Sequence, residues 1–207
     1  MYDLAEATRF LSRTDKTLAR LIVQVGAPDI HPPDRLNLFE ALMRSIVYQQ
    51  LSGKAASTIL GRVQALFPGR VVKPHEILDM PHEKLRGAGM SNAKVAAVKD
   101  LAQKSLDGLI PTGAKARKMS DEEILENLTQ VRGIGEWTVQ MVLMFKLGRP
   151  DILPVKDLGV RKGFMRAYGL AEMPTEKELM AHCEIWRPFR SVGSWYMWQA
   201  ADMINAD

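Results

Sequence analysis

Apolar positions repeat along most of the chain at the three- and four-residue spacing of helices that bury one face. The clearest run follows Pro33, where apolar side chains recur at i, i+3, i+4, i+7 and i+8. The runs are Phe39, Leu42, Met43, Ile46 and Val47; Val95, Val98, Leu101 and Ala102; and Ile124, Leu125 and Leu128. No stretch alternates apolar and polar residues for long enough to indicate a strand. We therefore predict an all-α fold.

Helix starts and a helix break divide this pattern. Two Ser/Thr-x-x-Glu sequences are typical of capping boxes, in which both side chains satisfy amides at a helix N-terminus. These pairs are Ser120 with Glu123 and Thr175 with Glu178. The Pro32-Pro33 step separates an N-terminal helical segment from the first long buried helix, and proline disfavours a continuous helix there. We expect the chain to cross between two domains near this step.

Composition narrows the class of protein. The chain has 207 residues, of which 46% are hydrophobic and 25% charged, as in ordinary globular proteins. Its single cysteine, Cys183, excludes an internal disulfide and a four-cysteine metal site built from this chain alone. No apolar run is long enough to span a bilayer and no signal peptide begins the chain, so we expect a cytoplasmic protein. The net charge of +4 is compatible with a polyanionic partner but does not establish one.

The most informative segment is Gly133-Ile134-Gly135, which separates an amphipathic helix from an apolar one. Glycine allows a positive φ and leaves the backbone uncovered, so a ligand can approach closely. Amides at the start of the second helix point outward and can bind a phosphate oxygen, while Ile134 is expected to point inward. A dinucleotide-binding loop is not expected, because no strand precedes the turn and the third glycine of that pattern is missing. Many helix junctions carry two glycines, so this turn by itself does not identify the function.

Residues 131–138, Val-Arg-Gly-Ile-Gly-Glu-Trp-Thr, resemble the hairpin of the helix–hairpin–helix DNA glycosylase superfamily. Further segments, in the expected order, resemble the 3-methyladenine DNA glycosylase II family. They are residues 46–52, residues 85–94, the Pro154-to-Asp157 element within residues 153–160, and residues 186–191 followed by Trp198. The resemblance covers roughly residues 36–200. We expect the compact, all-helical version of this family, without the mixed α/β domain that some members carry in front.

The resemblance implies two helical subdomains of the helix–hairpin–helix DNA glycosylase type, with the active-site cleft between them. Residues 36–150 would form the central subdomain, with the helix–hairpin–helix at about 124–145. Residues 1–35 and 151–207 would together form the second subdomain. The expected partner is damaged double-stranded DNA, and no membrane is involved. A monomer associated with the nucleoid, with no cofactor for catalysis, is expected.

Asp157 is the residue to which the family pattern gives the catalytic role. A carboxylate beside C1′ of the deoxyribose can stabilise the positive charge that develops as the base departs, and can orient or deprotonate the attacking water. From its sequence context alone, Asp157 is also a favoured helix N-cap. The two roles are compatible, because a cap position fixes the side chain. Asp151 is the alternative carboxylate and ranks below Asp157.

Trp137 indicates both the reaction type and the substrate. In superfamily members that also nick the strand, a lysine occupies this position and forms a Schiff base. Tryptophan cannot do so, and the resemblance therefore implies hydrolysis by water without a lyase step. Electron-rich aromatic side chains would stack on a cationic alkylated purine such as 3-methyladenine or 7-methylguanine, each contributing about 0.5–2 kcal/mol. The expected base-pocket residues are Trp137, Trp198, Met141 and Tyr48, whereas Trp186 and Trp195 are expected in the core.

Gln50 matches the family's intercalating position and is expected to fill the gap that a flipped base leaves in the duplex. Ser52 would reach the minor groove nearby, and the amides of Gly133 and Gly135 would bind phosphate. The other candidate DNA-binding side chains are Lys162, Arg161, Lys94 and Lys54. In the family the hairpin carbonyls can hold a structural potassium or sodium ion. Here those carbonyls would belong to Thr129, Val131 and Gly133.

Two alternatives remain open at this stage. The first is a glycosylase for another damaged base, such as hypoxanthine or an etheno-adduct, because the sequence does not reveal pocket shape. The second is a non-catalytic helix–hairpin–helix module that binds DNA without turnover, which would leave Asp157 and the aromatic residues unexplained. A metal-dependent nuclease is not expected, because the four histidines lack ligand spacing and no acidic cluster is present.

Overall fold

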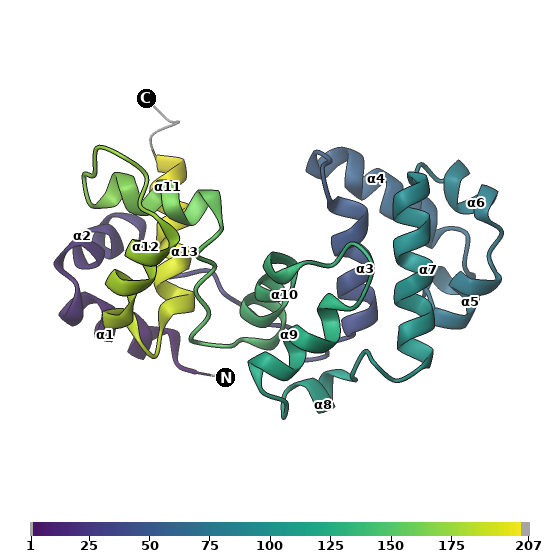
Figure 1. Cartoon of the computed structure of the whole chain (residues 1–207), viewed down its shortest axis with the longest axis horizontal. Coiled ribbons are helices and arrows are strands. Elements are labelled where there is room, and N and C mark those ends of the chain that lie inside the picture. The colour runs from purple at the N-terminus through teal and green to yellow at the C-terminus, as the bar shows by residue number, and fades with distance from the viewer. Residues whose placement is uncertain (1, 204–207) are drawn as a thin grey trace. The chain divides into compact units, whose positions relative to one another are not determined.

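The computed structural model describes residues 2–203, and within that range the chain is helical with no strand (Figure 1). The all-α prediction is therefore confirmed. Both capping boxes form as expected: Ser120 and Thr175 each accept from the third helical amide, while Glu123 and Glu178 accept from the cap amides. No helix among the described residues has the length and apolar character needed to cross a membrane.

The chain divides into two compact units, Pro33–Val142 and Met1–Pro32 with Leu143–Asp207. The sequence placed these boundaries at 35/36 and 150/151, so the second boundary lies earlier than expected. The reason is that the segment after α10 (Glu136–Val142) attaches to α13 (Arg190–Asp202). The Ser191 hydroxyl donates to the Arg149 carbonyl at 2.7 Å, and the Ser191 amide donates to the Pro150 carbonyl at 2.9 Å.

In the unit Pro33–Val142, α3 packs against α4 and α7, and α5 covers another part of α7. The predicted apolar face of α3 is buried, since Leu42, Ile46 and Val47 are fully inaccessible to solvent. Burial of one such side chain contributes about 1.5–3 kcal/mol. The elements are α3 (Leu38–Tyr48), α4 (Gly53–Gln64), η1 (Pro68–Arg70), α5 (Pro74–Asp79), α6 (His82–Gly87), α7 (Asn92–Leu106), α8 (Gly113–Ala116), α9 (Asp121–Thr129) and α10 (Glu136–Val142). The helix–hairpin–helix is formed by α9 and α10, which pack against each other.

In the other unit, α11 and α13 make the most extensive contact. They approach to backbone distance at Gly163, where an added Cβ would lie 1.7 Å from the Met197 carbonyl oxygen. The elements are α1 (Leu4–Thr14), α2 (Lys16–Val25), the π-helical η2 (Leu143–Leu147), α11 (Leu158–Ala167), α12 (Glu176–Cys183), η3 (Glu184–Trp186) and α13 (Arg190–Asp202). This close crossing fixes the start of α11 relative to the side chains of α13.

The core of this second unit contains a buried carboxylate, Asp15, at the N-cap of α2. Trp186 is fully buried, as predicted, and its indole N–H donates to Asp15 at 3.0 Å; the Tyr168 hydroxyl donates to the same oxygen. Burial opposes ionisation of Asp15, but hydrogen bonds from Trp186, Tyr168 and two backbone amides outweigh it and lower the pKa of Asp15. The ionised form of Asp15 is therefore stabilised, and its carboxylate links α2 to Trp186 and Tyr168.

Candidate functional site

Asp157 is the N-cap of α11 and has a fixed orientation. The turn before it is closed by the Asp157 amide, which donates to the Pro154 carbonyl at 2.9 Å. Its Oδ1 atom accepts from the Val160 amide at 2.8 Å and from the indole N–H of Trp198 at 2.9 Å. Both of these donors are uncharged, and they orient the carboxylate. The cap role that the sequence predicted is confirmed, and the indole contact is an addition that it did not predict.

Gly159 makes the contact between Asp157 and Trp198 sterically feasible. A Cβ at this position would lie 2.7 Å from Trp198 Cδ1 and 3.1 Å from Asp157 Oδ1, which is closer than ordinary packing allows. The glycine in the Asp-x-Gly sequence at the start of α11 was the signal for this close approach. It is also the reason that an aromatic side chain from α13 reaches the helix cap.

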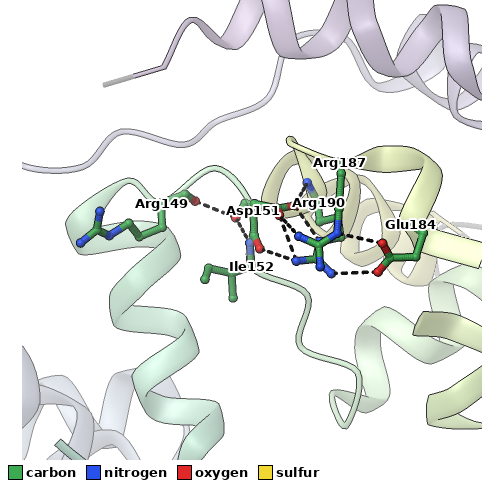
Figure 2. A network of polar contacts seen from close by, with 7 residues as sticks. Arg149, Asp151, Ile152, Glu184, Arg187 and Arg190 are labelled. Carbon is green, nitrogen blue, oxygen red and sulfur yellow. Dashed lines mark hydrogen bonds and ion pairs between the residues drawn. The ribbon is translucent and has the colours of Figure 1, made fainter. Parts of the chain in front are cut away.

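Asp151 lies six positions before Asp157 in the sequence, but its surroundings are different (Figure 2). Arg190 Nε donates to its Oδ1 at 2.6 Å, and Arg187 Nη1 donates to its Oδ2 at 2.5 Å. Both arginines also pair with Glu184. The charge of Asp151 is thus compensated by two guanidinium groups. Asp151 holds the Arg149–Ile152 segment to α13 instead of offering a carboxylate to a ligand.

Three of the four residues predicted to line a base pocket meet in the unit Pro33–Val142. Tyr48 from α3 and Trp137 and Met141 from α10 line a hollow of about 430 Å³. The remaining lining residues are Ser45, Gln49, Gln50 and Thr138. The Trp137 side chain is 51% exposed, which is unusual for an indole on an apolar helix. A large aromatic surface is therefore available to a ligand in this hollow.

Tyr48 and Trp198 make further contacts with neighbouring side chains. Tyr48 is stacked on one face by the exposed guanidinium of Arg44, whose Cζ lies 4.0 Å from the ring centroid. Trp198 belongs to the other unit, where it packs against Phe145 with ring centroids 5.8 Å apart and donates to Asp157. Within its own unit Trp198 therefore serves to orient the Asp157 carboxylate.

The hairpin between α9 and α10 has the geometry expected of it. Val131 and Ile134 are buried, and Gly133 has a φ of 79°, which favours glycine. Within residues 2–203 the amides of Gly133 and Gly135 have no protein acceptor, so both can donate to a ligand. An added Cβ at Gly135 would meet nothing within 4 Å. The bare backbone and free amides suit an anionic oxygen, as predicted.

Two side chains of α7 hold this hairpin. Asp100 accepts from the Arg132 amide at 2.7 Å, and Lys104 donates both to Asp100 and to the Gln130 carbonyl. Burial opposes ionisation of Asp100, but the hydrogen bonds from Arg132 and Lys104 outweigh it and lower its pKa. The sequence analysis did not identify this pair, because nothing local links α7 to the hairpin.

The carbonyls predicted to hold a monovalent cation are partly used within the protein. The Val131 oxygen accepts from the Ile134 amide at 3.0 Å, and the Gly133 oxygen accepts from Gln49 Nε2 at 2.8 Å. Each carbonyl keeps a second lone pair, so the donor type fits potassium or sodium. The Lys104 ammonium on the neighbouring Gln130 carbonyl already brings a positive charge to this turn.

The basic side chains predicted to contact DNA divide into two groups. Lys94 and Arg161 are engaged inside the protein: Lys94 Nζ donates to the Val47 and Gln49 carbonyls, and the Arg161 guanidinium donates twice to the Pro174 carbonyl. Lys162 on α11 and Lys54 at the start of α4 form no such bonds within the described residues. Ser52 is the N-cap of α4. The hydrogen-bonding evidence therefore favours Lys162 and Lys54 over Lys94 and Arg161 as free cations.

Gln49 is a site residue that the sequence analysis missed. Its amide nitrogen joins the end of α3 to the hairpin through the Gly133 carbonyl, 84 positions away in sequence. Gln50 next to it is exposed and has a φ of 57°, a left-handed conformation that is uncommon outside glycine. The adjacent glutamines were the only sequence signal, and they did not show which of the two points to the protein.

Comparisons with known proteins agree on one family. A family model described as "HhH-GPD superfamily base excision DNA repair protein" matches residues 43–188. DNA-3-methyladenine glycosylase 1 of Schizosaccharomyces pombe is 37% identical over 98% of this chain and 90% of its own length. A putative DNA-3-methyladenine glycosylase of Bacillus subtilis is 30% identical over 80% of this chain and 60% of its own length.

Solved structures extend the similarity to three dimensions. The 3-methyladenine DNA glycosylase of Schizosaccharomyces pombe in complex with abasic DNA has a TM-score of 0.83 and 36% identity, covering 98% of this chain and 99% of that one. The DNA-3-methyladenine glycosidase of Bacillus halodurans has a TM-score of 0.85 and 34% identity, covering 96% and 90%. Both the sequence and the arrangement of helices are thus shared along nearly the whole chain.

Proposed function

Because the chain belongs to the HhH-GPD superfamily of base excision DNA repair proteins, we propose that it is a monofunctional glycosylase that removes alkylated purines from duplex DNA. The resemblance inferred from the sequence is confirmed by these matches. The observation that carries the proposal is the Asp157 carboxylate, oriented by the Val160 amide and the Trp198 indole. Asp151, the competing carboxylate, is paired with two arginines.

Asp157 supplies the electrostatic part of the reaction. When the N-glycosidic bond breaks, its electron pair leaves with the base and positive charge develops on the deoxyribose ring. A fixed carboxylate beside C1′ stabilises that charge and orients the attacking water. The water oxygen forms the new bond to C1′, its proton is released, and the product is an abasic site.

Trp137 and the hollow around it supply the base recognition. Methylation at N3 of adenine or N7 of guanine gives a cationic purine, and an exposed indole attracts it by stacking and cation–π interaction. Met141 and Tyr48 complete the apolar lining. Tryptophan at position 137 provides no amine for a Schiff base, so the product is released without a strand-nicking step.

Gln50 and the hairpin supply the DNA contacts. We assign Gln50 to the gap left by the flipped nucleotide, because it is exposed and projects from a turn beside the hollow. The unpaired amides of Gly133 and Gly135 bind a backbone phosphate. Ser52 and Lys162 remain candidates for further contacts with DNA. Arg161 acts there only if it releases the Pro174 carbonyl.

Three further properties belong to the same proposal. Potassium or sodium on the Thr129, Val131 and Gly133 carbonyls would be structural, and it supplies no chemistry to bond cleavage. Exchange of potassium for tetramethylammonium, which is too large for carbonyl coordination, tests this by thermal melting and DNA binding. The expected cellular location is cytoplasmic and nucleoid-associated, and the expected state is a monomer, which light scattering at working concentration checks.

The decisive experiment measures base release from methylated duplex DNA by the wild-type protein and by Asp157→Asn. Released bases are identified by chromatography, and DNA binding is measured in parallel. Release of 3-methyladenine or 7-methylguanine by the wild type, lost in the variant, supports the proposal. Binding without release from methylated DNA contradicts it. Duplexes with hypoxanthine or an etheno-adduct then separate another lesion from a non-catalytic module. A covalent adduct trapped by borohydride would contradict the monofunctional assignment.

A further inference from the structure

The turn that ends α3 is held by hydrogen bonds to two other parts of the same unit, α7 and the hairpin. The helix ends at Tyr48, and the chain then passes through Gln49 and Gln50 before α4 begins. Gln50 adopts a φ of 57° although it is not glycine, a conformation that is disfavoured by contact between Cβ and the backbone. A residue held in such a conformation needs support from its surroundings, and this often occurs at functional sites.

Lys94 provides the first support. It lies at the third position of α7, and its ammonium donates to the Val47 carbonyl at 2.7 Å and to the Gln49 carbonyl at 2.9 Å. The Val47 carbonyl belongs to the last turn of α3 and the Gln49 carbonyl to its C-cap, where helix carbonyls lack partners and a cation is favoured. The side chain is half-buried, and this burial lowers the pKa of Lys94. An ammonium committed to two carbonyls is poorly placed to neutralise a phosphate.

Gln49 provides the second support. Its side-chain amide donates to the Gly133 carbonyl at 2.8 Å, so the turn is also tied to the hairpin. The carbonyl of the peptide between Gln49 and Gln50 is therefore held by Lys94, and the Gln49 side chain is held by the hairpin. Gln50 projects from this turn. The exposed Gln50 side chain is the one member of this group that can enter a duplex.

We infer that Lys94 is a positioning residue that holds the Gln49–Gln50 turn in the conformation from which Gln50 enters DNA, and that it is not a phosphate contact. The inference rests on the proposed function, because it assigns Lys94 a role in the same base-flipping step. It replaces the interpretation of Lys94 as a DNA-binding lysine. Gln49 assists by fixing the distance between the turn and the hairpin.

A double-mutant cycle tests this inference. Lys94→Met keeps the aliphatic stem and removes the ammonium, Gln50→Ala removes the intercalating side chain, and the double variant combines both changes. Single-turnover excision is measured on duplex DNA with one 7-methylguanine. Lys94→Met is expected to be about tenfold slower than wild type, and the double variant to match Gln50→Ala within about twofold, because Lys94 acts through Gln50. Independent effects that multiply would overturn the inference.

The salt dependence of DNA binding provides a readout that a general loss of stability would not change. Loss of one phosphate contact lowers the slope of log K against log salt by about 0.9. We expect the slope of Lys94→Met to equal that of the wild type, and a fall of that size would show a phosphate contact. Lys99→Met is the matched control, since Lys99 is also on α7 and donates to the Leu78 carbonyl away from the turn. It should retain wild-type excision.

A second variant keeps the test valid if Lys94→Met does not fold. Gln49→Leu removes the tie to the hairpin and leaves Lys94 in place, and it is expected to show the same non-additivity with Gln50→Ala. If the effects of Gln49→Leu and Gln50→Ala on excision are additive, the proposed support of the turn is contradicted. If the wild-type protein excises no base, the proposed function fails first. If the wild type is active and only the cycles are additive, the inference about Lys94 alone fails.

Discussion

Asp151 and Asp157 lie in one short segment of the chain, yet different groups hold them in place. Asp151 is bound by Arg187 and Arg190, and it ties the Arg149–Ile152 segment to the start of α13. Asp157 accepts from a backbone amide and an indole, both neutral. A carboxylate with two guanidinium partners, such as Asp151, has little potential left for a developing sugar cation.

The two carboxylates are also connected through the segment between them and through α13. The arginine contacts of Asp151 hold the segment that leads into the Pro154 turn, and that turn places Asp157 at the cap of α11. Both residues reach α13, Asp151 at its first residue and Asp157 at Trp198. Asp151 therefore ties the segment that precedes Asp157 to the start of α13.

Asp157→Asn should have the largest effect on excision. Asparagine caps helices as well as aspartate does, so stability should be unchanged, but the negative charge beside the sugar is lost. We expect single-turnover excision to fall by about 100-fold or more. Asp157→Ala is the matched variant, and it should lose about 0.5–2 kcal/mol of stability as well, because the cap is removed. Equal excision rates for the wild type and Asp157→Asn would contradict a chemical role for Asp157.

Gly159→Ala should rank second. The new Cβ would displace the Trp198 indole from Asp157, and misplacement of a catalytic group by about 1 Å can reduce the rate by about 100-fold. Excision should fall by tenfold or more. Gly61→Ala in α4 is the control, because an added Cβ there meets nothing within 4 Å. That change should be neutral or slightly stabilising. Wild-type rates in both variants would contradict a need for close approach at the cap.

Trp198→Phe should have a moderate effect. Phenylalanine retains the aromatic packing against Phe145 but cannot donate to Asp157. Loss of a hydrogen bond to a charged group is worth about 1.5–3 kcal/mol, so we expect excision to slow by about tenfold. Trp195→Phe on the same helix serves as the control and should keep the rate. A change confined to substrate affinity would instead favour a role for Trp198 in holding the base.

Asp151→Asn should have the smallest effect on chemistry and a clear effect on stability. Its removal leaves the partly buried Arg190, whose side chain is 12% exposed, without its main partner. We expect unfolding free energy to fall by about 1–3 kcal/mol, measured by urea titration. Excision at a temperature well below the transition should stay near wild type. Glu184→Gln, on the exposed side of the same network, should cost less. If Asp151→Asn lowered the excision rate as much as Asp157→Asn, the structural role assigned to Asp151 would be contradicted.

The sequence was sufficient for the fold class and for the order of the functional segments. Helical periodicity showed the buried face of α3, the capping boxes showed where α9 and α12 begin, and the glycines showed the hairpin. These features depend on neighbours within a few positions along the chain. The same local logic identified Asp157 as a cap, and the resemblance to a family added its catalytic assignment.

Tertiary structure decided which side chains remain available to a ligand. From the sequence Lys94 and Lys162 are equal candidates for DNA contacts, but Lys94 donates to the Val47 carbonyl of α3 and to the carbonyl of its C-cap, Gln49. The sequence identified Gln50 but not Gln49, and it did not pair Trp198 with Asp157. Each of these outcomes depends on a hydrogen bond between residues 41 to 84 positions apart. Periodicity, capping and charge report local neighbours, whereas partners across the fold are fixed only when helices pack.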